Sequence, residues 1–307
     1  MEKSGRLLIV GGTGFIGRGV AREAINRRFQ VSIISKNNCP KLKQIKGVEY
    51  IVVDITKKNE LLLKLKGKLF DYVLNLGGYV NHTNYSSGGS GVYDAHFNGV
   101  RNLIDCLNKV GLKGFLQIGS SDEYGGNPAP QYENQRESPI SPYSCAKVAS
   151  TYFLQTLYKT ERFPAIIFRP FLVYGPGQSD DRFIPQIIKG CLSGKSFPVS
   201  RGEQLRDFCF IDDFIEAVFL ALDNKAAHGE VINIASGKPV SIKNMIEKIV
   251  SIVGFGRPKY GGIKYREGEN MTLYGDISKS KYILDWEATT SLDQGLKKTF
   301  LFVNNNE

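Results

Sequence analysis

The first half of the chain alternates between short apolar runs and longer stretches in which apolar residues recur with helical spacing. The apolar runs show little polar alternation, which is typical of parallel strands with both faces covered. They predict strands at Arg6–Val10, Gln30–Ile34, Val48–Val53, Tyr72–Leu76, Phe115–Ile118 and Ala165–Arg169. Helices are predicted between them at Phe15–Asn26, Lys57–Lys66, His96–Val110 and Pro142–Lys159. This order of elements predicts an α/β fold with a doubly wound parallel sheet.

The pattern changes after Tyr174, where Gly175, Pro176 and Gly177 interrupt it. Short helices, a few strands and a glycine-rich segment at 254–262 follow. We therefore predict one domain over residues 1–174 and a smaller lobe over residues 175–307, with the chain crossing back to the sheet around residues 205–235. Open α/β sheets bind ligands at the carboxyl edge of their strands, so the lobe is expected to close over that edge and to bind a substrate there.

Composition limits the kinds of partner. Of the 307 residues, 42% are hydrophobic, but no apolar run is long enough to span a membrane. The net charge of +10 comes from Lys and Arg residues spread along the chain, which is typical of a solvated surface and not of a nucleic-acid site. The five cysteines form no Cys-x-x-Cys pair and the three histidines are isolated, so no disulfide framework or metal site is expected. The start of the chain lacks a signal segment, and a cytoplasmic location is expected.

A glycine-rich turn joins the first predicted strand to the first helix. Glycines at 11, 14 and 17 allow a tight turn, close approach of backbone N–H groups to a pyrophosphate, and close packing of helix on strand. Such a turn can be purely structural, but its place in a βαβ unit is the context that dinucleotide binding requires. The sequence therefore predicts a Rossmann domain that binds NADP or NAD through Gly11, Thr13, Gly14, Phe15, Ile16 and Gly17.

The second strand ends in Ser35-Lys36, at the position where an acidic residue would bind the ribose hydroxyls of NAD. A carboxylate there would repel a 2′-phosphate, whereas Ser35 and Lys36 can accept one. NADP is therefore favoured over NAD, although Lys36 could instead point into solvent. Asp54 and Ile55, which follow the third strand, are expected near the adenine.

Tyr143 and Lys147 are spaced i,i+4 in a predicted helix and so share one face of it. A free tyrosine has a pKa of about 10, but a lysine ammonium and an oxidised nicotinamide beside it would stabilise the phenolate. Tyr143 is then suited to exchange a proton with a substrate hydroxyl or ketone while hydride moves at carbon. The same spacing recurs at Tyr260 and Lys264, but the glycines between them disfavour a helix.

Hydroxyl groups follow the fifth predicted strand at Ser120 and Ser121. A serine beyond this strand can hydrogen-bond the reacting oxygen and share its charge. Both serines are candidates for that catalytic role, and both are also compatible with simple turn chemistry.

Together these motifs resemble the extended short-chain dehydrogenase/reductases, the NAD-dependent epimerase/dehydratase family, over nearly the whole chain. Leu76-Gly77-Gly78 falls where that family has Leu-Ala-Ala, and Asn98-Gly99-Val100-Arg101-Asn102 resembles its Asn-x-x-Gly-Thr-x-Asn helix. The segment 168–177 matches the one that passes the nicotinamide, and 202–213 resembles the signature of the substrate lobe.

The resemblance implies an enzyme that modifies a nucleotide-activated sugar. Ser120, four residues before Tyr124, then aligns best with the catalytic Ser/Thr beside Tyr143 and Lys147. Arg206 and Arg266 would clamp the diphosphate of the substrate, unless they are surface charges. Further cofactor contacts are expected from Leu76, Gly77, Gly78, Asn98, Pro170 and Val173, and further substrate contacts from Asp122, Glu123, Arg182, Phe183 and Glu269.

Three reactions share this scaffold. A 4,6-dehydratase resembles Ser/Thr-Asp-Glu-x-Tyr-Gly at the serine turn, whereas Asp122 and Glu123 run into Tyr124 one residue short. A C4 epimerase usually has an acid where this chain has Ser35. A 4-keto reductase needs only Ser, Tyr, Lys and NADPH, and parts of the chain resemble GDP-4-keto-6-deoxymannose reductases and CDP-abequose synthase. We therefore predict NADPH-dependent reduction of a nucleotide 4-keto-6-deoxy sugar, with an epimerase or dehydratase as the alternative and a non-catalytic NADP(H)-binding regulator as a remote one.

The resemblance also implies a homodimer, because the helices predicted at His96–Val110 and Pro142–Lys159 commonly form a four-helix interface in this family. The apolar residues expected in that interface are Leu103, Leu107, Val148, Phe153 and Leu157, although they could equally pack on the sheet.

Overall fold

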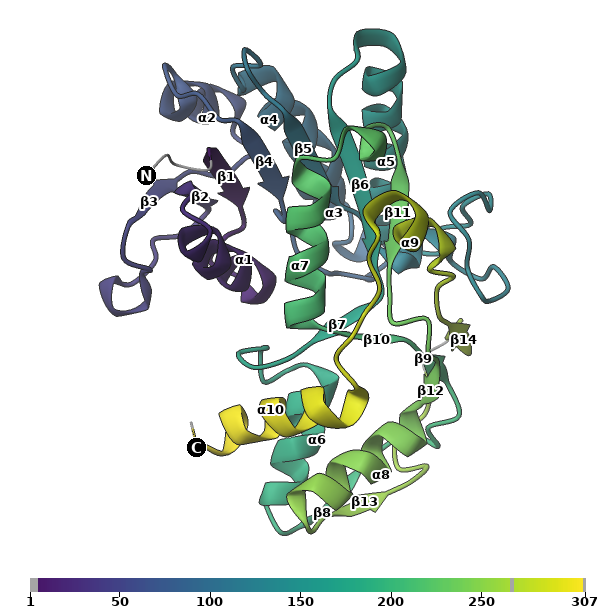
Figure 1. The fold of residues 1–307 in the computed structure, drawn as a ribbon. Helices are drawn as coiled ribbons and strands as arrows, with labels where there is room; N and C mark the ends of the chain where they lie inside the picture. The colour runs from purple at the N-terminus through teal and green to yellow at the C-terminus, as the bar shows by residue number, and fades with distance from the viewer. Residues whose placement is uncertain (1–4, 266–267, 306–307) are drawn as a thin grey trace.

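The computed structural model describes residues 5–265 and 268–305. Its centre is a parallel sheet of seven strands in the order β11-β6-β5-β4-β1-β2-β3 (Figure 1). The strands are β1 (Arg6–Val10), β2 (Gln30–Ser35), β3 (Val48–Val52), β4 (Tyr72–Asn75), β5 (Gly114–Ile118), β6 (Ala165–Pro170) and β11 (Val231–Ile234). This is the doubly wound Rossmann-type arrangement, and it confirms the predicted fold class.

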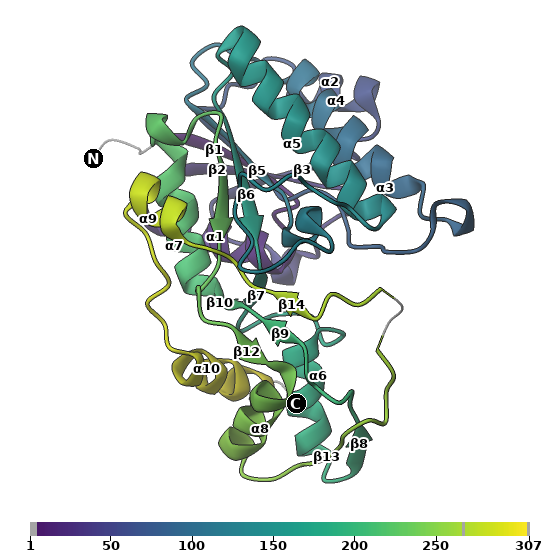
Figure 2. The same ribbon diagram turned by 90° about the vertical axis from the view of Figure 1, so that its right-hand side faces the viewer.

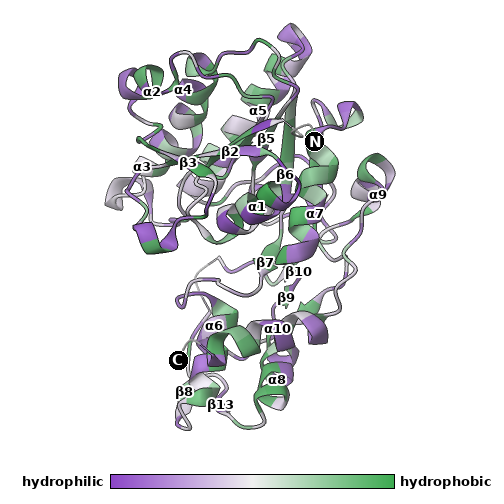
Figure 3. Cartoon of the chain, turned by 60° about the vertical axis from the view of Figure 1, so that its left-hand side comes forward, coloured by the Kyte–Doolittle hydropathy of each residue, from purple (hydrophilic) through white to green (hydrophobic). Residues whose placement is uncertain are grey.

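Helices cover both faces of the sheet. The helices on one face are α1 (Phe15–Asn26) and α7 (Ile211–Leu222), and those on the other are α2 (Lys58–Leu65), α4 (Gly99–Cys106) and α5 (Pro142–Glu161). Leu7 and Ile9 of β1 join the core on the α1 side, whereas Leu8 and Val10 join the core on the α5 side. Because both faces are buried, the strands are apolar throughout. Figure 3 shows this hydrophobic character along β6.

The helix predicted at His96–Val110 is less regular than expected. The structure has a short helix α3 (Gly91–Tyr93), a π-helical turn (Asp94–Asn98) and then α4, which ends at Cys106. Leu107 is extended, and the side chain of Asn108 accepts the N–H of Val110 at 3.0 Å. An asparagine turn of this kind competes with the helical hydrogen bonds and ends the helix early.

A smaller group of elements lies below the carboxyl edge of the sheet in Figures 1 and 2. Its helices are α6 (Phe183–Leu192), α8 (Ile242–Val253) and α10 (Leu292–Asn304). Its strands are β8 (Ser196–Pro198), β9 (Leu205–Arg206), β12 (Val240–Ser241), β13 (Arg257–Lys259) and β14 (Thr272–Leu273). The strand β7 (Leu172–Tyr174), which continues from β6, pairs with β10 (Phe208–Phe210) where the two parts meet.

Residues after Tyr174 contribute to both parts of the molecule. The helix α7 and the strand β11 lie with the large sheet, and α9 (Ser278–Leu284) packs beside them. The chain therefore passes between the two parts more than once. Across the described ranges, no helix is both long and apolar enough to cross a membrane.

Candidate active site

The turn between β1 and α1 leaves no room for side chains. A Cβ at Gly17 would lie 2.5 Å from the Cα of Gly12, and Gly11 has a positive φ of 75°. Gly14 precedes the first helical turn, and no side chain caps that end of α1, so its N–H groups remain available to a ligand. Thr13, Phe15 and Ile16, which complete the segment, are all partly exposed. Backbone and helix end together form a cradle that fits a pyrophosphate.

The residues predicted to meet the adenosine lie together at the ends of β2 and β3. The Lys36 ammonium is 3.1 Å from the Asp54 carboxylate, while the Ser35 hydroxyl donates to the carbonyl of Asn37 at 2.8 Å. Burial opposes ionisation of Asp54, but the N–H of Thr56 and the Lys36 ammonium lower its pKa. Ile55 is buried next to this pair. The Lys36 side chain is 75% exposed, and its ammonium is already paired with the Asp54 carboxylate.

The end of β4 packs closely on the π-helical turn. Gly78 has a φ of 121°, and a Cβ there would collide with the ring of His96 at 2.1 Å. The N–H of Gly77 is held by the Asn75 side chain at 3.0 Å, and Leu76 packs against the core on the α1 side. Only glycine fits position 78, because its conformation and its contact both exclude a side chain.

Asn98 does not face the same region as Leu76–Gly78. Its amide donates to the carboxylate of Asp94 at 2.9 Å on the outside of the π-helical turn. His96, two residues earlier, is the residue that turns inward, and it is buried against Tyr143. The expected cofactor contact from Asn98 is therefore not supported by the structure.

Ser120, Tyr143 and Lys147 meet at the carboxyl edge of the sheet. The Ser120 hydroxyl lies near the Tyr143 hydroxyl and favours its ionised form, and it accepts the N–H of Asp122 at 3.1 Å. The Lys147 ammonium donates to the carbonyl of Ile118 at 2.6 Å and lies 5.8 Å from the centre of the Tyr143 ring. Ser121 is buried in the next turn, so Ser120 is the serine that reaches the tyrosine.

The start of α5 explains why Tyr143 and Lys147 point in this direction. Ser141 caps the helix by accepting the N–H of Ser144 at 3.1 Å, and Pro142 occupies the first helical position. Proline suits that position because the first N–H of a helix has no internal partner. The cap fixes where α5 begins, and the i,i+4 spacing then places both side chains on its inner face.

Burial sets the protonation of these two groups. Burial and the charge of Asp122 raise the pKa of Tyr143, and the hydrogen bond with Ser120 opposes them. Burial lowers the pKa of Lys147 to about 8, although Glu123 and Asp122 raise it. In the protein alone Tyr143 is therefore a neutral phenol, and a positive charge beside it is needed to make it a base.

Two histidines that sequence reasoning passed over lie against the Tyr143 ring. The rings of His96 and His82 meet it edge-on, with centres 5.0 Å and 5.5 Å away. The His82 Nε2 atom is also 3.8 Å from the Asp122 carboxylate. Burial and the charge of Lys147 lower the pKa of His96 to about 3, so that its ring is neutral. One signal was present, because counting the family spacing Asn-x-x-Gly back from Gly99 leads to His96 and not to Asn98.

The two acids of the serine turn face opposite directions. Asp122 is partly exposed on the side of Tyr143 and His82. Glu123 is fully buried and holds the N–H of Ser120 at 2.9 Å and the guanidinium of Arg169 at 2.8 Å. The expected substrate contact from Glu123 is therefore wrong, since both of its oxygens are bonded inside the protein.

The residues predicted to bind substrate in the smaller lobe lie on separate elements. Arg206 of β9 is buried and forms an ion pair with Glu269 from the segment before β14. Arg182 is exposed just before α6, and its charge acts on Tyr143. Phe183 packs on Phe208 with ring centres 6.2 Å apart. Arg266 lies outside the described residues. Pro170 at the end of β6 and Val173 in the middle of β7 are half-buried.

The glycine cradle and the group of Ser120, Tyr143 and Lys147 lie at one edge of a doubly wound sheet, which is how nicotinamide-dependent oxidoreductases are built. Comparison with known proteins then gives the family. Residues 7–235 match the model of the NAD dependent epimerase/dehydratase family, and the chain belongs to that enzyme family.

Several relatives match almost end to end. A UDP-glucuronate 4-epimerase of Thermodesulfobacterium geofontis is 27% identical over 310 residues, which cover 96% of this chain and 95% of that protein. A dTDP-glucose 4,6-dehydratase of Haemophilus influenzae is 26% identical over 95% of this chain and 96% of that protein. A crystal structure of UDP-glucuronic acid 4-epimerase from Bacillus cereus, with UDP-4-deoxy-4-fluoro-glucuronic acid and NAD, is 26% identical with a TM-score of 0.87 and covers 98% of this chain and 100% of that one.

These relatives correct one expectation. They are named as epimerases and dehydratases, whereas the sequence favoured a 4-keto reductase. The reductase interpretation was drawn from short segments and from Ser35, while these matches extend over nearly the full chain. The alternative that the sequence left open, an epimerase or dehydratase, is the better supported one.

Proposed function

We propose that this protein is an NAD-dependent C4 epimerase of a UDP-activated hexose or hexuronic acid. The observation that carries the proposal is the meeting of Ser120, Tyr143 and Lys147 at the same sheet edge as the glycine cradle. Two of the full-length relatives, one of them solved with NAD, are named as UDP-sugar 4-epimerases. The epimerase also needs no acid or base beyond these three side chains.

The cradle at residues 11–17 fits NAD, because Gly14 is exposed at the start of α1, where no side chain caps the helix and backbone N–H groups can bind a pyrophosphate. The choice between NAD and NADP depends on Lys36. Its pairing with Asp54 places a negative charge where a 2′-phosphate would need only positive ones, which favours NAD. NADP, which the sequence favoured, remains the alternative, since an exposed ion pair is weak and Lys36 can leave it.

A bound nicotinamide would supply the hydride acceptor for C4 of the sugar and then the hydride donor for the opposite face of the 4-keto sugar. Tyr143 as the phenolate removes the proton of the C4 hydroxyl during oxidation and gives it back during reduction. Lys147 stabilises that phenolate, and the Ser120 hydroxyl hydrogen-bonds the reacting oxygen. Arg206, which lies on the smaller lobe, would hold the diphosphate while the sugar turns.

A second candidate is a 4,6-dehydratase, and one contact favours it. Elimination of water across C5 and C6 needs a further base for the C5 proton and a further acid for the C6 hydroxyl. Asp122 and His82, which are 3.8 Å apart next to the Tyr143 ring, are groups of the required kind. A dehydratase from Haemophilus influenzae is among the full-length relatives.

One experiment separates these reactions. The purified protein is incubated with NAD and UDP-glucose, UDP-glucuronic acid or dTDP-glucose, and the products are followed by NMR. An epimerase converts a gluco sugar into its galacto epimer with no net change in NAD, whereas a dehydratase yields a 4-keto-6-deoxy sugar. A further incubation contains NADPH and a nucleotide 4-keto sugar. Consumption of NADPH there, with no reaction in the incubations with NAD, would support the reductase interpretation instead.

We also propose a homodimer through α4 and α5, on a narrower surface than the sequence suggested. Leu103 and Leu107 are buried in the core on the α5 side and cannot reach a partner. Val148, Phe153 and Leu157 are half-buried and keep some apolar surface. Light scattering at micromolar concentration should give the mass of two chains, and a single-chain mass would refute this interface.

A further inference from the structure

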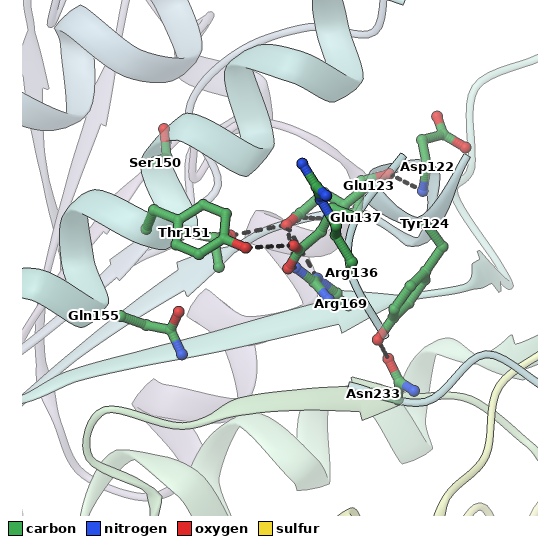
Figure 4. A network of polar contacts seen from close by, with 12 residues as sticks. Asp122, Glu123, Tyr124, Arg136, Glu137, Ser150, Thr151, Gln155, Arg169 and Asn233 are labelled. Carbon is green, nitrogen blue, oxygen red and sulfur yellow. Dashed lines mark hydrogen bonds and ion pairs between the residues drawn. The ribbon is translucent and has the colours of Figure 1, made fainter. Parts of the chain in front are cut away.

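Glu123, Arg169 and Glu137 form a buried ion network behind the turn that carries Ser120 (Figure 4). The side chains of Arg169 and Glu123 are 0% exposed. Arg169 donates to one oxygen of Glu123 through Nε at 3.0 Å and Nη2 at 2.8 Å, and Nη2 also reaches Glu137 at 2.5 Å. Buried charges cost free energy unless they are paired, so each member of the network depends on the others.

The two carboxylates of this network have different neighbours. Glu123 accepts the N–H of Ser120 at 2.9 Å through Oε1 and the hydroxyl of Thr151 at 2.9 Å through Oε2. Thr151 lies on α5 one turn beyond Lys147. Glu137 instead accepts the hydroxyl of Tyr152 at 2.7 Å at the protein surface. Tyr152 also lies on α5, so both carboxylates contact this helix, but of the two only Glu123 also accepts a hydrogen bond from the serine turn.

We propose that Glu123 is a positioning residue of the reaction: its carboxylate fixes the turn of Ser120 against α5, and its charge acts on Lys147. The Ser120 hydroxyl lies near the Tyr143 hydroxyl, so a shift of the turn relative to α5 changes the separation of the two groups directly. Displacement of a catalytic group by about 1 Å can cost about 100-fold in rate. The kinetic part of this inference rests on the proposed function, while the electrostatic part does not.

The electrostatic part concerns the groups that surround the Lys147 ammonium. They are Tyr143 on its own helix, neutral His96 on the π-helical turn, Asp122 and Glu123 on the serine turn, and Arg169 of β6 behind Glu123. Burial lowers the pKa of Lys147 to about 8, and the charges of Glu123 and Asp122 limit that fall. A neutral side chain at 123 removes one of these charges, so Lys147 should lose its proton at a lower pH than in the wild type.

The test compares Glu123→Gln with Glu137→Gln. Each variant removes one carboxylate from Arg169, but only the first removes a contact with Ser120 and Thr151. The protein is labelled with ¹³C-lysine, and the Cε resonance lost in Lys147→Met is followed against pH by NMR. We expect Lys147 to titrate at lower pH in Glu123→Gln and at the wild-type pH in Glu137→Gln. An unchanged titration in Glu123→Gln, or equal shifts in both variants, would overturn the proposal.

Two additions keep the test decisive. If Glu123→Gln does not fold, the double variant Glu123→Gln with Arg169→Gln enters the same titration and is compared with Arg169→Gln alone, so that both proteins lack the arginine charge. A pKa of Lys147 in the double variant that is no lower than in Arg169→Gln overturns the proposal. If the wild type epimerises UDP-glucose or UDP-glucuronic acid, kcat should fall by up to about 100-fold in Glu123→Gln with little change in KM. If it turns over neither sugar, the proposed function fails and the NMR titration still decides the role of Glu123.

Discussion

The chain contains the spacing Tyr-x-x-x-Lys twice, and the two copies lie in unlike surroundings. Tyr143 and Lys147 are on α5 and are 6% and 5% exposed, and the lysine ammonium lies over the tyrosine ring. Tyr260 follows β13 in a turn, is 37% exposed, and its ring faces Lys243 at 5.7 Å. The spacing is the same, but only a helix converts it into a shared face. Burial then strengthens the electrostatic interaction between the two groups, because the interior of a protein screens charges less than water does.

The comparison predicts that the effect of a substitution follows the burial of the group and its contacts with neighbours. Tyr143→Phe keeps the ring and removes the hydroxyl, so folding and NAD affinity should change little. The turnover rate should fall by roughly 10²–10⁴-fold, the usual contribution of a positioned acid or base. The rate is measured at saturating NAD with the nucleotide sugar that the NMR assay identifies.

Tyr260→Phe is the matched control, because it makes the same chemical change in the second copy. Its turnover should equal that of the wild type. Near-normal turnover of Tyr143→Phe together with loss of turnover in Tyr260→Phe would show that the active site lies at the second copy and that its assignment to Tyr143 is wrong.

The lysines extend the comparison to cofactor binding. Lys147→Met removes the ammonium that stabilises the phenolate, and it also removes the group expected to touch the nicotinamide ribose. The rate should therefore fall by about 100-fold or more, and NAD should bind more weakly, as measured by calorimetric titration. Lys264→Met, at an exposed position, should change neither quantity. Loss of rate without any change in NAD affinity would remove Lys147 from the cofactor site.

The same contrast shows what the sequence could and could not reveal. The apolar strands and the glycine turn are local patterns, and they predicted the doubly wound sheet with strand bounds close to those observed. The direction of a side chain in an irregular segment is not local. Asn98 was placed near the cofactor, but the π-helical turn rotates it outward and brings His96 inward.

The place of Glu123 in a buried ion network was not foreseen for a related reason, since the sequence grouped it with Asp122 as a substrate contact. In the sequence it stands beside Asp122 in a polar turn, and nothing local distinguishes the two acids. Their roles differ because Arg169, which is distant in sequence, is buried behind the turn and captures only Glu123. A buried ion pair between distant residues has no periodicity to detect, so the structure was required.

Arg206 tests how far the comparison extends into the smaller lobe. It is buried and paired with Glu269, unlike the exposed Arg201 in the same part of the chain. Arg206→Gln should raise KM for the nucleotide sugar by roughly 10- to 100-fold, because a buried charge that binds a phosphate is worth a few kcal/mol. The change in kcat should be smaller, since Arg206 does not touch the reacting carbon. An unchanged KM in Arg206→Gln, or an equal rise in Arg201→Gln, would rule out a diphosphate clamp at this residue.

The smallest effect is expected at Lys36, an exposed residue among the predicted ligand-binding residues. Its side chain is 75% exposed and its partner is Asp54 at 3.1 Å. An exposed ion pair is worth at most about 1 kcal/mol, which is about fivefold in affinity. This limit applies to the pair with Asp54 and equally to a pair between Lys36 and a 2′-phosphate. Lys36→Ala should therefore weaken NADP binding by no more than about fivefold and leave NAD binding unchanged, as measured by calorimetric titration of both cofactors. Asp54→Asn should act in the opposite direction on NADP, because it removes a negative charge from the same place. A large loss of NADP affinity in Lys36→Ala, together with tighter binding of NADP than NAD by the wild type, would show that Lys36 binds the 2′-phosphate. The cofactor of the protein would then be NADP.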